Sequence, residues 1–341
     1  MKVTISDVAK LAGVSTATVS HTINNTRYVS NETKEKVYRA IEELGYTPDA
    51  SARSFRTGKK KIIGFIVPDI ANKFFATMIE SVEKYLSANG YQLIIANIAN
   101  TRENMDREET NIRLLTAGLV DGLLVASTMD DFQRFDALIP AGFPVVLVDR
   151  IFETKKYSSV CVSNFQPIYR SVCRLAGKGD QRIGIIGGLP RLSSTQERIS
   201  AYRQAVADCG LPEDEHLIQY GDSLENSACA CLDQLLERKC DAIIVCQGLM
   251  ASETIIYLHQ KGIQLAQDID LVSFVDYDSD VYALYANQMD SIIQPVEDLG
   301  QAAGEQILRR VEVPDAPIFE NVLTSTYRPY NQPRAWSHSD R

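Results

Sequence analysis

The stretch from Thr4 to Asn25 constrains this chain most, because its pattern predicts two short helices joined by a tight turn. The bend falls at residues 12–14, and the hydroxyl of Ser15 is placed to cap the second helix. Apolar side chains recur at helical spacing on both segments, so two apolar stripes can face one small core. The stripe residues are Ile5, Val8 and Leu11 on the first helix and Val19 and Ile23 on the second.

The other face of the second helix carries short hydroxyl and methyl groups with one imidazole, and no carboxylate. Its residues are Thr16, Ala17, Thr18, Ser20 and His21. Such side chains suit the base edges and phosphates of a DNA major groove, where the second helix of a helix-turn-helix lies. An ordinary helical hairpin fits the same short pattern, so the sequence that follows has to decide between the two.

A third helix is predicted from Ser30 to Gly45, because apolar residues at 37, 41 and 44 fall at helical spacing. The three helices complete a small domain of residues 1–46. Residues 47–61 are basic, and residues 50–56 within them could form two helical turns at most, too few to be stable alone in water. This segment is either a simple linker or a hinge that becomes helical on DNA, with Phe55 as an apolar wedge and Arg53 and Arg56 on phosphate.

Charge is divided unevenly along the chain. Residues 1–61 contain eleven Lys or Arg and six Asp or Glu, although the whole chain has a net charge of -9. The first part therefore carries +5 and the remaining 280 residues carry -14. A small basic module on a large acidic body is typical of a DNA-binding head attached to another domain.

From residue 62 onward, strand-like apolar runs alternate with amphipathic helices in two successive series. The expected strands are 62–67, 91–98, 122–126 and 144–148, then 182–187, 217–220, 241–246 and 271–275. This alternation predicts an α/β body, residues 62–341, with two doubly wound parallel sheets in two similar lobes. We expect lobe 1 at about 62–162 and 293–325 and lobe 2 at about 163–292 and 326–341, with strands at 291–294 and 322–327 crossing between them.

Ligands of open parallel sheets bind at the carboxyl ends of the strands, so a ligand of this body would lie between the lobes. Polar and aromatic residues just past those ends are the candidate contacts. They are Asp69, Phe74, Phe75, Asn97, Asn100, Asp149, Arg150, residues 193–198 including Ser194, Gln247 and Asp276. Together they suit a small polyhydroxylated or acidic molecule, although each one singly also fits a helix cap or a surface residue.

The sequence does not support a membrane protein, a secreted protein, a metal-binding protein or an enzyme. No apolar run is long enough for a membrane helix and the first residues have no signal-peptide core, so we expect a cytoplasmic location. The seven cysteines are scattered, and Cys229-x-Cys231 lacks the partner spacing of a zinc site. Phosphate-loop, dinucleotide and nucleophile motifs are missing and the four histidines are dispersed, so we expect no cofactor, no metal and no enzyme activity.

Several segments resemble the lactose repressor and galactose repressor family of bacterial transcription regulators. The head contributes DVAKLAGVSTATVSHTIN, VSNETKEKVYRAIEELGYTP and ARSFRTGK. The body contributes IIGFIVPDIANKFF, DGLLVAST, PVVLVDR, RIGIIGG, ERISAY and DLVSFVDYD. The resemblance implies a homodimer or tetramer, a palindromic operator and a core built like a periplasmic sugar-binding protein.

The resemblance also implies roles for residues of the head. Thr16, Ala17 and His21 match positions that read bases. Positions that contact or orient phosphates are matched by Thr4, Ser15, Thr18, Ser20, Asn24, Tyr28, Ser30 and Thr33. Phe55 stands where the family usually has a leucine that inserts at the centre of the operator, so the wedge here is bulkier.

In the cleft, the resemblance assigns effector contacts to Arg198 and Asp276, an aromatic wall to residues 74–75 and a polar end of the first lobe to residues 149–150. Other positions depart from the family pattern. Lys73 replaces a proline or small residue, Ser163 replaces an aspartate, and Gln247-Gly248 replaces Asn-Asp. Two acidic positions are lost and a cation is gained, which favours an anionic sugar such as a sugar acid.

We therefore expect a dimeric, effector-responsive DNA-binding regulator, a repressor of a carbohydrate-use operon controlled by a sugar or sugar acid. Residues 328–341 have two prolines and no apolar repeat, which favours a dimer over a tetramer. Two alternatives stay open. One is a sugar-sensing or carrier protein without operator binding, and the other is an enzyme on the same scaffold.

Overall fold

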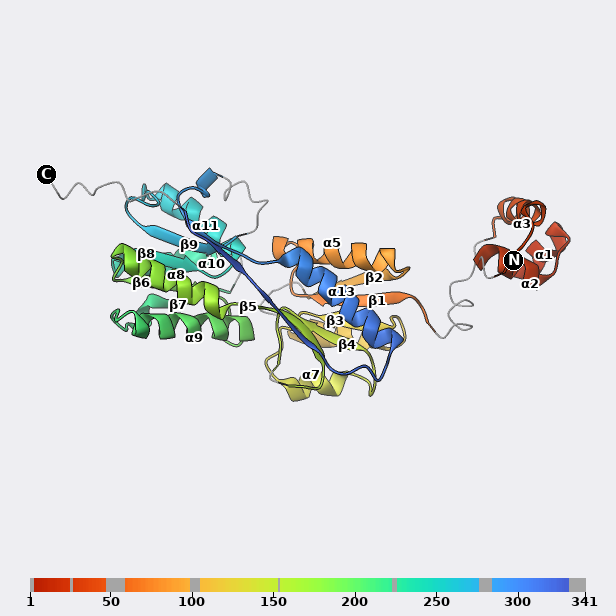
Figure 1. The fold of residues 1–341 in the computed structure, drawn as a ribbon, viewed down its shortest axis with the longest axis horizontal. Coiled ribbons are helices and arrows are strands. Elements are labelled where there is room, and N and C mark those ends of the chain that lie inside the picture. Colours follow the sequence, from red (N-terminus) through yellow and green to blue (C-terminus); the bar gives the residue numbers. More distant parts are fainter. Residues whose placement is uncertain are drawn as a thin grey trace. The chain divides into compact units, whose positions relative to one another are not determined.

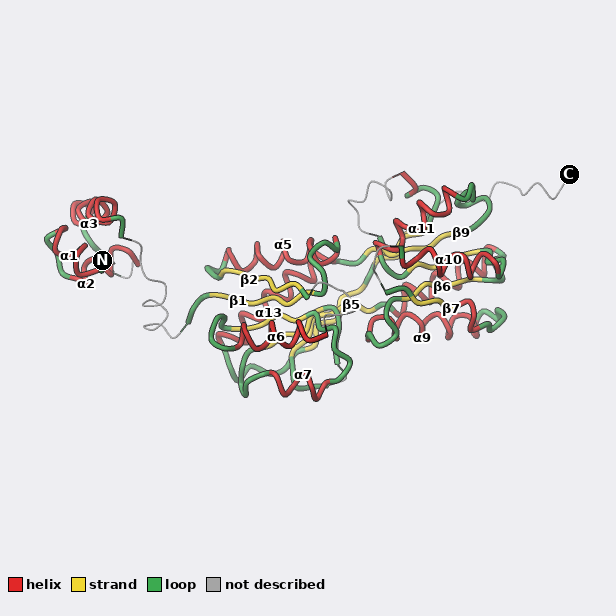
Figure 2. Tube along the Cα trace, turned by 180° about the vertical axis from the view of Figure 1, so that it is seen from behind, coloured by secondary structure: helices red, strands yellow, loops and turns green. Residues whose placement is uncertain are grey.

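The computed structural model describes residues 3–24, 27–46, 59–98, 105–152, 154–222, 226–275 and 284–330 (Figures 1 and 2). The chain forms two units, a head up to Lys60 and a body from Lys61 onward. Within the described residues, no helix is both long and apolar enough to cross a membrane.

The head consists of α1 (Ile5–Ala12), α2 (Thr16–Asn24) and α3 (Asn31–Leu44). Gly13 ends α1 in the left-handed conformation at φ +66°, where glycine carries no steric penalty. The predicted cap of α2 is present, because the Ser15 hydroxyl accepts a hydrogen bond from the Thr18 amide at 3.1 Å. Ser30 caps α3 in the same way through the Thr33 amide.

Val8, Val19 and Val37, one from each helix, are fully buried and form the core of the head with Ala9 and Ala40. The expectation that Leu11 belongs to this core is wrong, because its side chain is 45% exposed. Each helical residue turns the chain by about 100°, so the sixth residue after Ile5 points well away from it. The fourth residue, Ala9, returns to the stripe and is buried.

Lobe 1 of the body is built on an entirely parallel sheet of order β11-β5-β4-β3-β1-β2. Its strands are β1 (Ile62–Val67), β2 (Gln92–Asn97), β3 (Gly122–Val125), β4 (Val145–Val148), β5 (Ser158–Ser163) and β11 (Glu320–Thr324). Helices α5 (Lys73–Ala88) and α13 (Val296–Glu312) pack on one face of the sheet and α6 (Met105–Thr116) and α7 (Phe132–Leu138) on the other (Figures 1 and 2).

Side-chain alternation along β1 explains why both faces are covered. Phe65 and Val67 join the core beneath α5 and α13, whereas Ile66 joins the core beneath α6 and α7. All three are fully buried. A strand buried on both faces reads as the continuous apolar run seen in the sequence.

Lobe 2 repeats this plan with a sheet of order β12-β10-β9-β8-β6-β7. Its strands are β6 (Ile183–Gly187), β7 (Ile218–Tyr220), β8 (Ala242–Val245), β9 (Asp270–Phe274), β10 (Asp290–Ile293) and β12 (Thr326–Arg328). The helices are α8 (Phe165–Lys178) and α9 (Ser193–Asp208) on one face, and α10 (Ser227–Glu237) and α11 (Gly248–Gln260) on the other, with a 3-10 turn η1 (Glu215–Leu217) before β7. The prediction of two doubly wound lobes is confirmed.

The strand expected at 322–327 differs from the structure, which divides this segment between the lobes. β11 pairs in parallel with β5 in the first sheet, whereas β12 pairs antiparallel with β10 in the second. The break falls at Ser325, where the chain passes from one sheet to the other. Strand β5 was not among the strands expected from sequence, because its run SSVCVS is only half apolar.

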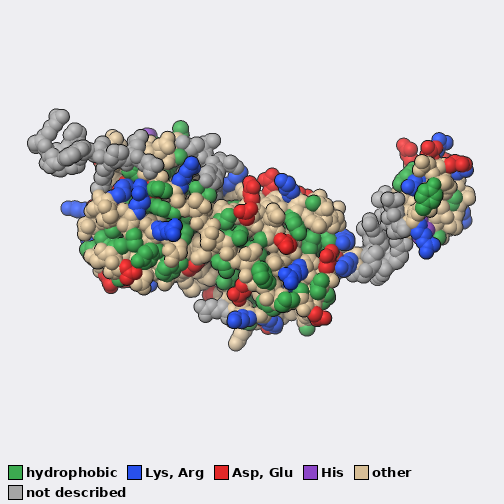
Figure 3. Space-filling model, in the orientation of Figure 1, with side chains coloured by type: hydrophobic (Ala, Val, Ile, Leu, Met, Phe, Trp, Pro, Cys, Tyr) green, Lys and Arg blue, Asp and Glu red, His purple; other side chains and the backbone are tan. Residues whose placement is uncertain are grey.

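Both sheets reverse strand order beside their first strand, since β1 lies between β2 and β3 and β6 lies between β7 and β8. In such sheets a crevice opens at the carboxyl ends of the strands at this reversal. On the face of the body seen in Figure 3, acidic and basic side chains are interspersed rather than gathered by sign.

Candidate functional site

In the head, α2 presents the polar face predicted for it. Thr16 and Ala17 are exposed and Ser20 and His21 are half-buried, while Val19 points into the core. The Ser15 and Thr18 hydroxyls are hydrogen-bonded at 2.9 Å, which orients both beside this face. The face holds hydroxyl, methyl and imidazole groups and no acidic side chain.

The remaining predicted contacts of the head are placed on its surface or lie outside the described residues. Tyr28 is 95% exposed, and Thr33 lies in the first turn of α3 beside its cap. The Thr4 hydroxyl and amide both donate to the Asp7 carboxylate, and these hydrogen bonds lower the pKa of Asp7. Asn24 is the last residue of α2. The hinge residues Arg53 and Phe55 lie outside the described residues.

In the body, a cavity of about 60 Å³ lies where the carboxyl ends of strands from both lobes meet. Its lining combines aromatic rings, amides and charged groups from the two lobes. The lining residues are Asn72, Phe74, Phe75, Asp149, Arg150, Ser194, Arg198, Cys246, Gln247, Gly248, Phe274, Val275 and Gln294. We refer to this site as the cleft cavity.

Arg198 reaches the cleft cavity from α9 and is fixed by its neighbours. Its Nε and Nη2 donate to the Asn164 side-chain oxygen, at 3.1 and 2.9 Å, and its Nη1 donates to the Cys246 carbonyl at 2.6 Å. The guanidinium lies over the Phe274 ring, 4.0 Å from its centroid. Only 6% of the residue is exposed, and burial lowers the pKa of Arg198.

On the lobe 1 side, Asp149 and Arg150 follow β4. Asp149 has φ +65°, a strained conformation for a residue with a side chain, and such strain is common at ligand sites. Its carboxylate lies 3.6 Å from Arg150 Nε. Burial raises the pKa of Asp149, and the nearby guanidinium groups of Arg150 and Arg198 oppose that rise.

Two buried donors of the cleft cavity have no hydrogen-bond partner among the described residues. They are Arg150 Nε and Gln294 Nε2. A buried donor without a partner costs about 1–3 kcal/mol, so a ligand that accepts from it recovers that free energy. Among the described lining residues, Arg150 and Arg198 face one carboxylate, that of Asp149. The lining therefore holds two guanidinium groups, one carboxylate and two unsatisfied donors, and the Glu108 and Glu197 carboxylates act on Arg150 and Arg198 from outside the lining.

Hydrogen bonds join the lobes beside the cavity. The Ile151 amide donates to the Ser193 hydroxyl at 3.2 Å, and Arg191 Nε donates to the Thr128 carbonyl at 3.5 Å. Thr128 is itself held by the fully buried Glu108, whose carboxylate accepts from the Thr128 amide and hydroxyl at 2.8 and 2.6 Å. The lobes are thus fastened together around a small cavity.

The structure brings most of the predicted effector contacts into this cavity. Phe74, Phe75, Asp149, Arg150, Ser194, Arg198 and Gln247 line it. Lys73, the first residue of α5, is exposed and lies outside the lining. Asp276 and Asn100 lie outside the described residues.

Some of the residues predicted at strand ends have local structural roles, and two residues that line the cavity were not predicted from the sequence. Asp69 and Asn97 accept from the amides of Ala71 and Ile70, which fixes the turn after β1. Ser163 donates to Glu197. Gln294 and Phe274 were missed, although both stand at the ends of strands that the sequence predicts, so the rule that found Gln247 could have found them.

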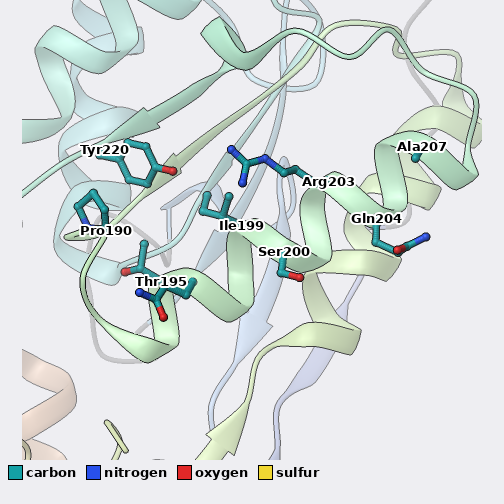
Figure 4. Close-up of a pocket in the computed structure, with 9 residues that line it drawn as sticks. Pro190, Thr195, Ile199, Ser200, Arg203, Gln204, Ala207 and Tyr220 are labelled. Atoms are coloured by element: carbon teal, nitrogen blue, oxygen red, sulfur yellow. The ribbon is translucent and has the colours of Figure 1, made fainter. Parts of the chain in front are cut away.

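A larger concavity of about 430 Å³ lies along α9 on the outside of lobe 2 (Figure 4). Its lining includes Thr195, Ile199, Arg203 and Tyr220. Arg203 is engaged by Glu215 through two hydrogen bonds, and none of the buried unpartnered polar atoms of the described residues belongs to this lining. The chemistry of the cleft cavity, rather than the size of this groove, makes the cleft the better candidate.

The described residues hold no group of three or more His, Cys, Asp or Glu side chains placed to bind a metal ion. The Cys229-x-Cys231 pair lies within α10, where Cys231 packs in the core of lobe 2.

Two family models match the chain. Residues 4–49 match bacterial regulatory proteins of the lacI family, and residues 60–329 match the periplasmic binding proteins and sugar binding domain of the LacI family. The chain is 33% identical to the HTH-type transcriptional repressor PurR of Photobacterium profundum, over 91% of this chain and 92% of that protein. It is 32% identical to the ribose operon repressor of Haemophilus influenzae, over 95% and 96%.

Solved structures agree in fold. A transcriptional regulator CelR in complex with cellobiose matches with a TM-score of 0.72 and 28% identity, over 98% of this chain and 100% of that chain. The lac repressor dimer bound to its operator and an anti-inducer matches with a TM-score of 0.84 and 22% identity, over the same shares. PurR and the ribose operon repressor are transcription repressors, a class of protein that acts without catalysis.

Proposed function

Because this chain belongs to the LacI family of bacterial regulatory proteins, a family of DNA-binding transcription repressors with an effector-binding body, we propose that it represses a carbohydrate-use operon as a homodimer. The head binds one half-site of a palindromic operator, and an anionic sugar in the cleft cavity sets the affinity of the dimer for DNA. Since operator DNA lies in the bacterial cytoplasm, the protein acts there.

The polar face of α2 supports the proposal for the head. Thr16 and Ala17 are exposed and His21 is half-buried, so all three can reach base edges when α2 lies in a major groove. Hydroxyl groups around them bind phosphates, which position the helix without reading sequence. Thr4, Ser15, Thr18, Ser20, Asn24, Tyr28, Ser30 and Thr33 are proposed for this second role, and Arg53 and Phe55 for the hinge.

Exposed apolar side chains at one edge of each sheet support a dimer. Ile94 and Ile95 lie on the edge strand β2 of lobe 1, and Tyr220 lies on the edge strand β7 of lobe 2. Leu114 of α6 and Ile256 of α11 are also exposed, at 57% and 46%. Exposed apolar side chains are stabilised when a partner covers them. In a two-fold symmetric dimer, the same surface is covered on both protomers.

The single observation that carries the effector proposal is the buried Arg150 Nε, which lies 3.6 Å from the Asp149 carboxylate and makes no hydrogen bond, in a lining with two guanidinium groups and one carboxylate. A carboxylate or phosphate on the ligand accepts from Arg150 and Gln294. Asp149, Ser194 and Gln247 can bond sugar hydroxyls. Phe74 and Phe75 offer apolar faces to the ring of the sugar.

Binding at the cleft cavity requires the lobes to separate. Its volume of about 60 Å³ is far below the roughly 300–1,000 Å³ of pockets that enclose drug-sized ligands. Opening breaks the Ile151–Ser193 and Arg191–Thr128 hydrogen bonds. Ligand binding must therefore offset the free energy of these bonds, which favour the closed state. If the change in lobe orientation alters the hinge segments, ligand binding changes the affinity for the operator. The coupling free energy between two such sites is typically about 1–3 kcal/mol.

A thermal-shift screen against neutral sugars, sugar acids and sugar phosphates tests this proposal. A ligand at a hundred times its dissociation constant adds about 2.7 kcal/mol of stability. We expect anionic sugars to give the larger shifts, Arg150→Gln to abolish them, and the matched variant Arg203→Gln on the outside of lobe 2 to keep them. Shifts from neutral sugars that survive Arg150→Gln would refute an anionic effector, and turnover of a bound sugar would indicate an enzyme.

A further inference from the structure

Burial separates the seven cysteines of the chain into two groups. Four are buried, namely Cys161, Cys231, Cys240 and Cys246, and three are half-buried, namely Cys173, Cys209 and Cys229. Two of the half-buried thiols lie side by side. The sulfur atoms of Cys173 and Cys209 are 3.2 Å apart, although 36 residues separate them in the chain.

The helices that carry these thiols pack closely along one face of lobe 2 (Figure 1). Cys173 lies in α8 and Cys209 is the residue that caps the end of α9. Tyr169, one turn before Cys173, donates its hydroxyl to the Asp208 carboxylate at 3.0 Å. Because this hydrogen bond joins the same two helices beside the sulfurs, it holds the thiols in register.

We propose that Cys173 and Cys209 form an oxidisable dithiol, at which a peroxide converts the two thiols into a disulfide that joins α8 to α9. The sulfur atoms of a disulfide are about 2.03–2.05 Å apart, so these two must approach by about 1.2 Å. Rotation of the two side chains can supply that movement while the helices stay in place. Both thiols are half-buried rather than enclosed, which leaves a small oxidant access.

The reaction needs only hydrogen peroxide as the oxidant. A thiolate sulfur bonds to one peroxide oxygen, the O–O bond breaks, and hydroxide leaves, which gives a sulfenic acid. The other thiol then attacks the sulfenic sulfur, the S–O bond breaks, and water leaves with the thiol proton. Two electrons and two protons pass from the thiols to the peroxide, which becomes two waters.

Burial, together with the neighbouring Cys173, raises the pKa of the Cys209 thiol to about 11. The same disulfide forms whichever of the two thiols reacts first with the peroxide, because the other thiol then closes the bond. Disulfides of cytoplasmic proteins are usually transient and redox-sensing, which fits a pair that is reduced at rest.

The disulfide joins the middle of α8 to the end of α9 that lies away from the cleft cavity. Nearer the cavity, Asn164 is the residue just before α8, and its side-chain oxygen accepts a hydrogen bond from Arg198 of α9. A cross-link that closes a 36-residue loop restricts the unfolded chain and stabilises the folded body. We therefore expect the melting temperature of the oxidised protein to rise by several degrees.

Peptide mapping of the full-length protein tests the proposal. Reduced protein is treated with hydrogen peroxide, its remaining thiols are alkylated, and it is cleaved with trypsin and a glutamate-specific protease, because cleavage at Glu213 and Glu225 separates Cys209 from Cys229 and Cys231. The peptides are analysed by mass spectrometry. We expect a cross-linked pair containing Cys173 and Cys209, with a rise in melting temperature that dithiothreitol reverses. The Cys173→Ser variant should show neither the cross-linked pair nor the rise in melting temperature. The Cys229→Ser variant, which lacks the third half-buried thiol, should show both.

Full alkylation of both cysteines after peroxide treatment would overturn the proposal. So would sulfinic acid at Cys173 without a cross-link, or a disulfide from either residue to another cysteine. The peptide map of the unsubstituted protein is decisive by itself, even where a variant fails to fold. It needs neither DNA nor a sugar, so its outcome is independent of the proposed function.

Discussion

Arg198 donates two hydrogen bonds to one atom of Asn164, the side-chain oxygen, from Nε at 3.1 Å and from Nη2 at 2.9 Å. Asn164 is the residue just before α8 and is 3% exposed, and Arg198 also donates to the Cys246 carbonyl, just past the end of β8. One guanidinium thus ties together α8, α9 and the strand edge that forms the lobe 2 wall of the cleft cavity. Arg198 therefore supports the fold as well as lining the cleft cavity.

Arg198→Met should therefore destabilise the protein even without ligand. Two buried acceptors, the Asn164 side-chain oxygen and the Cys246 carbonyl, lose their donor, and each unsatisfied acceptor costs about 1–3 kcal/mol. Urea unfolding measures the loss. Arg203→Met on the same helix is the control, because its exposed pair with Glu215 is worth at most about 1 kcal/mol. Equal losses in the two variants would contradict a structural role for Arg198.

Gly122→Ala should destabilise lobe 1. A Cβ at this position of β3 would lie 2.8 Å from a methyl group of Val311 and 2.9 Å from one of Ile307, both on α13, so these side chains or the helix have to shift. Overpacking of this kind costs about 1–3 kcal/mol in urea unfolding. Gly177→Ala in α8 is the matched control, because its Cβ meets no described atom within 4 Å and alanine favours helix by about 0.5–1 kcal/mol. If Gly122→Ala stabilised the protein, α13 would pack less tightly on β3 than the distances at Gly122 indicate.

Ser15→Ala and Thr16→Ala should separate stability from DNA binding in the head. Ser15 caps α2, so its loss costs about 1 kcal/mol of stability. Thr16 is exposed in the first turn, and its loss should change stability by less than about 0.5 kcal/mol while it weakens operator binding. Thermal unfolding of the head and fluorescence anisotropy with operator DNA measure the two effects. If Thr16→Ala bound the operator normally, Thr16 would not be one of the residues that contact the bases.

Asp136 should make part of the stability depend on acidic pH. Hydrogen bonds from Lys156 and Tyr157 lower the pKa of Asp136 in the folded protein. Its contribution is therefore complete above the unfolded pKa of about 3.9 and is lost as the pH falls through the lower folded value. Unfolding free energies of the unsubstituted protein and Asp136→Asn should differ at pH 6 and converge towards pH 3. A constant difference across that range would contradict this linkage.

The sequence was sufficient for the parts of the fold that depend on local pattern. The cap at Ser15, the stripe of Val19 and Ile23, and the apolar runs of β1 and β6 follow from spacing alone. Leu11 was misplaced because a spacing of three was extended too far along the helix. The expected passage between the lobes at residues 325–326 coincides with the break between β11 and β12. The sheet edge that each of these strands joins depends on the assembled lobes.

The cleft was predictable in outline and not in detail. Strand ends identified Asp149, Arg150 and Gln247, because the parallel-sheet rule fixes where such residues gather. This rule could not show that Arg198 is hydrogen-bonded to Asn164 and Cys246, or that Arg150 Nε makes no hydrogen bond, since these contacts join residues distant in sequence. The approach of Cys173 to Cys209 depends in the same way on how two helices pack.

The central claim, that a cleft ligand controls operator binding, is tested most directly by an anisotropy titration. An operator is first selected from random DNA with the full-length protein, and its affinity is then measured with increasing concentrations of the anionic sugar found by thermal shift. We predict a palindromic operator whose dissociation constant changes by a factor of about 5–150 on ligand binding. Arg150→Gln should remove this change and leave ligand-free affinity intact. A ligand that fills the cleft and leaves operator affinity unchanged would contradict the account.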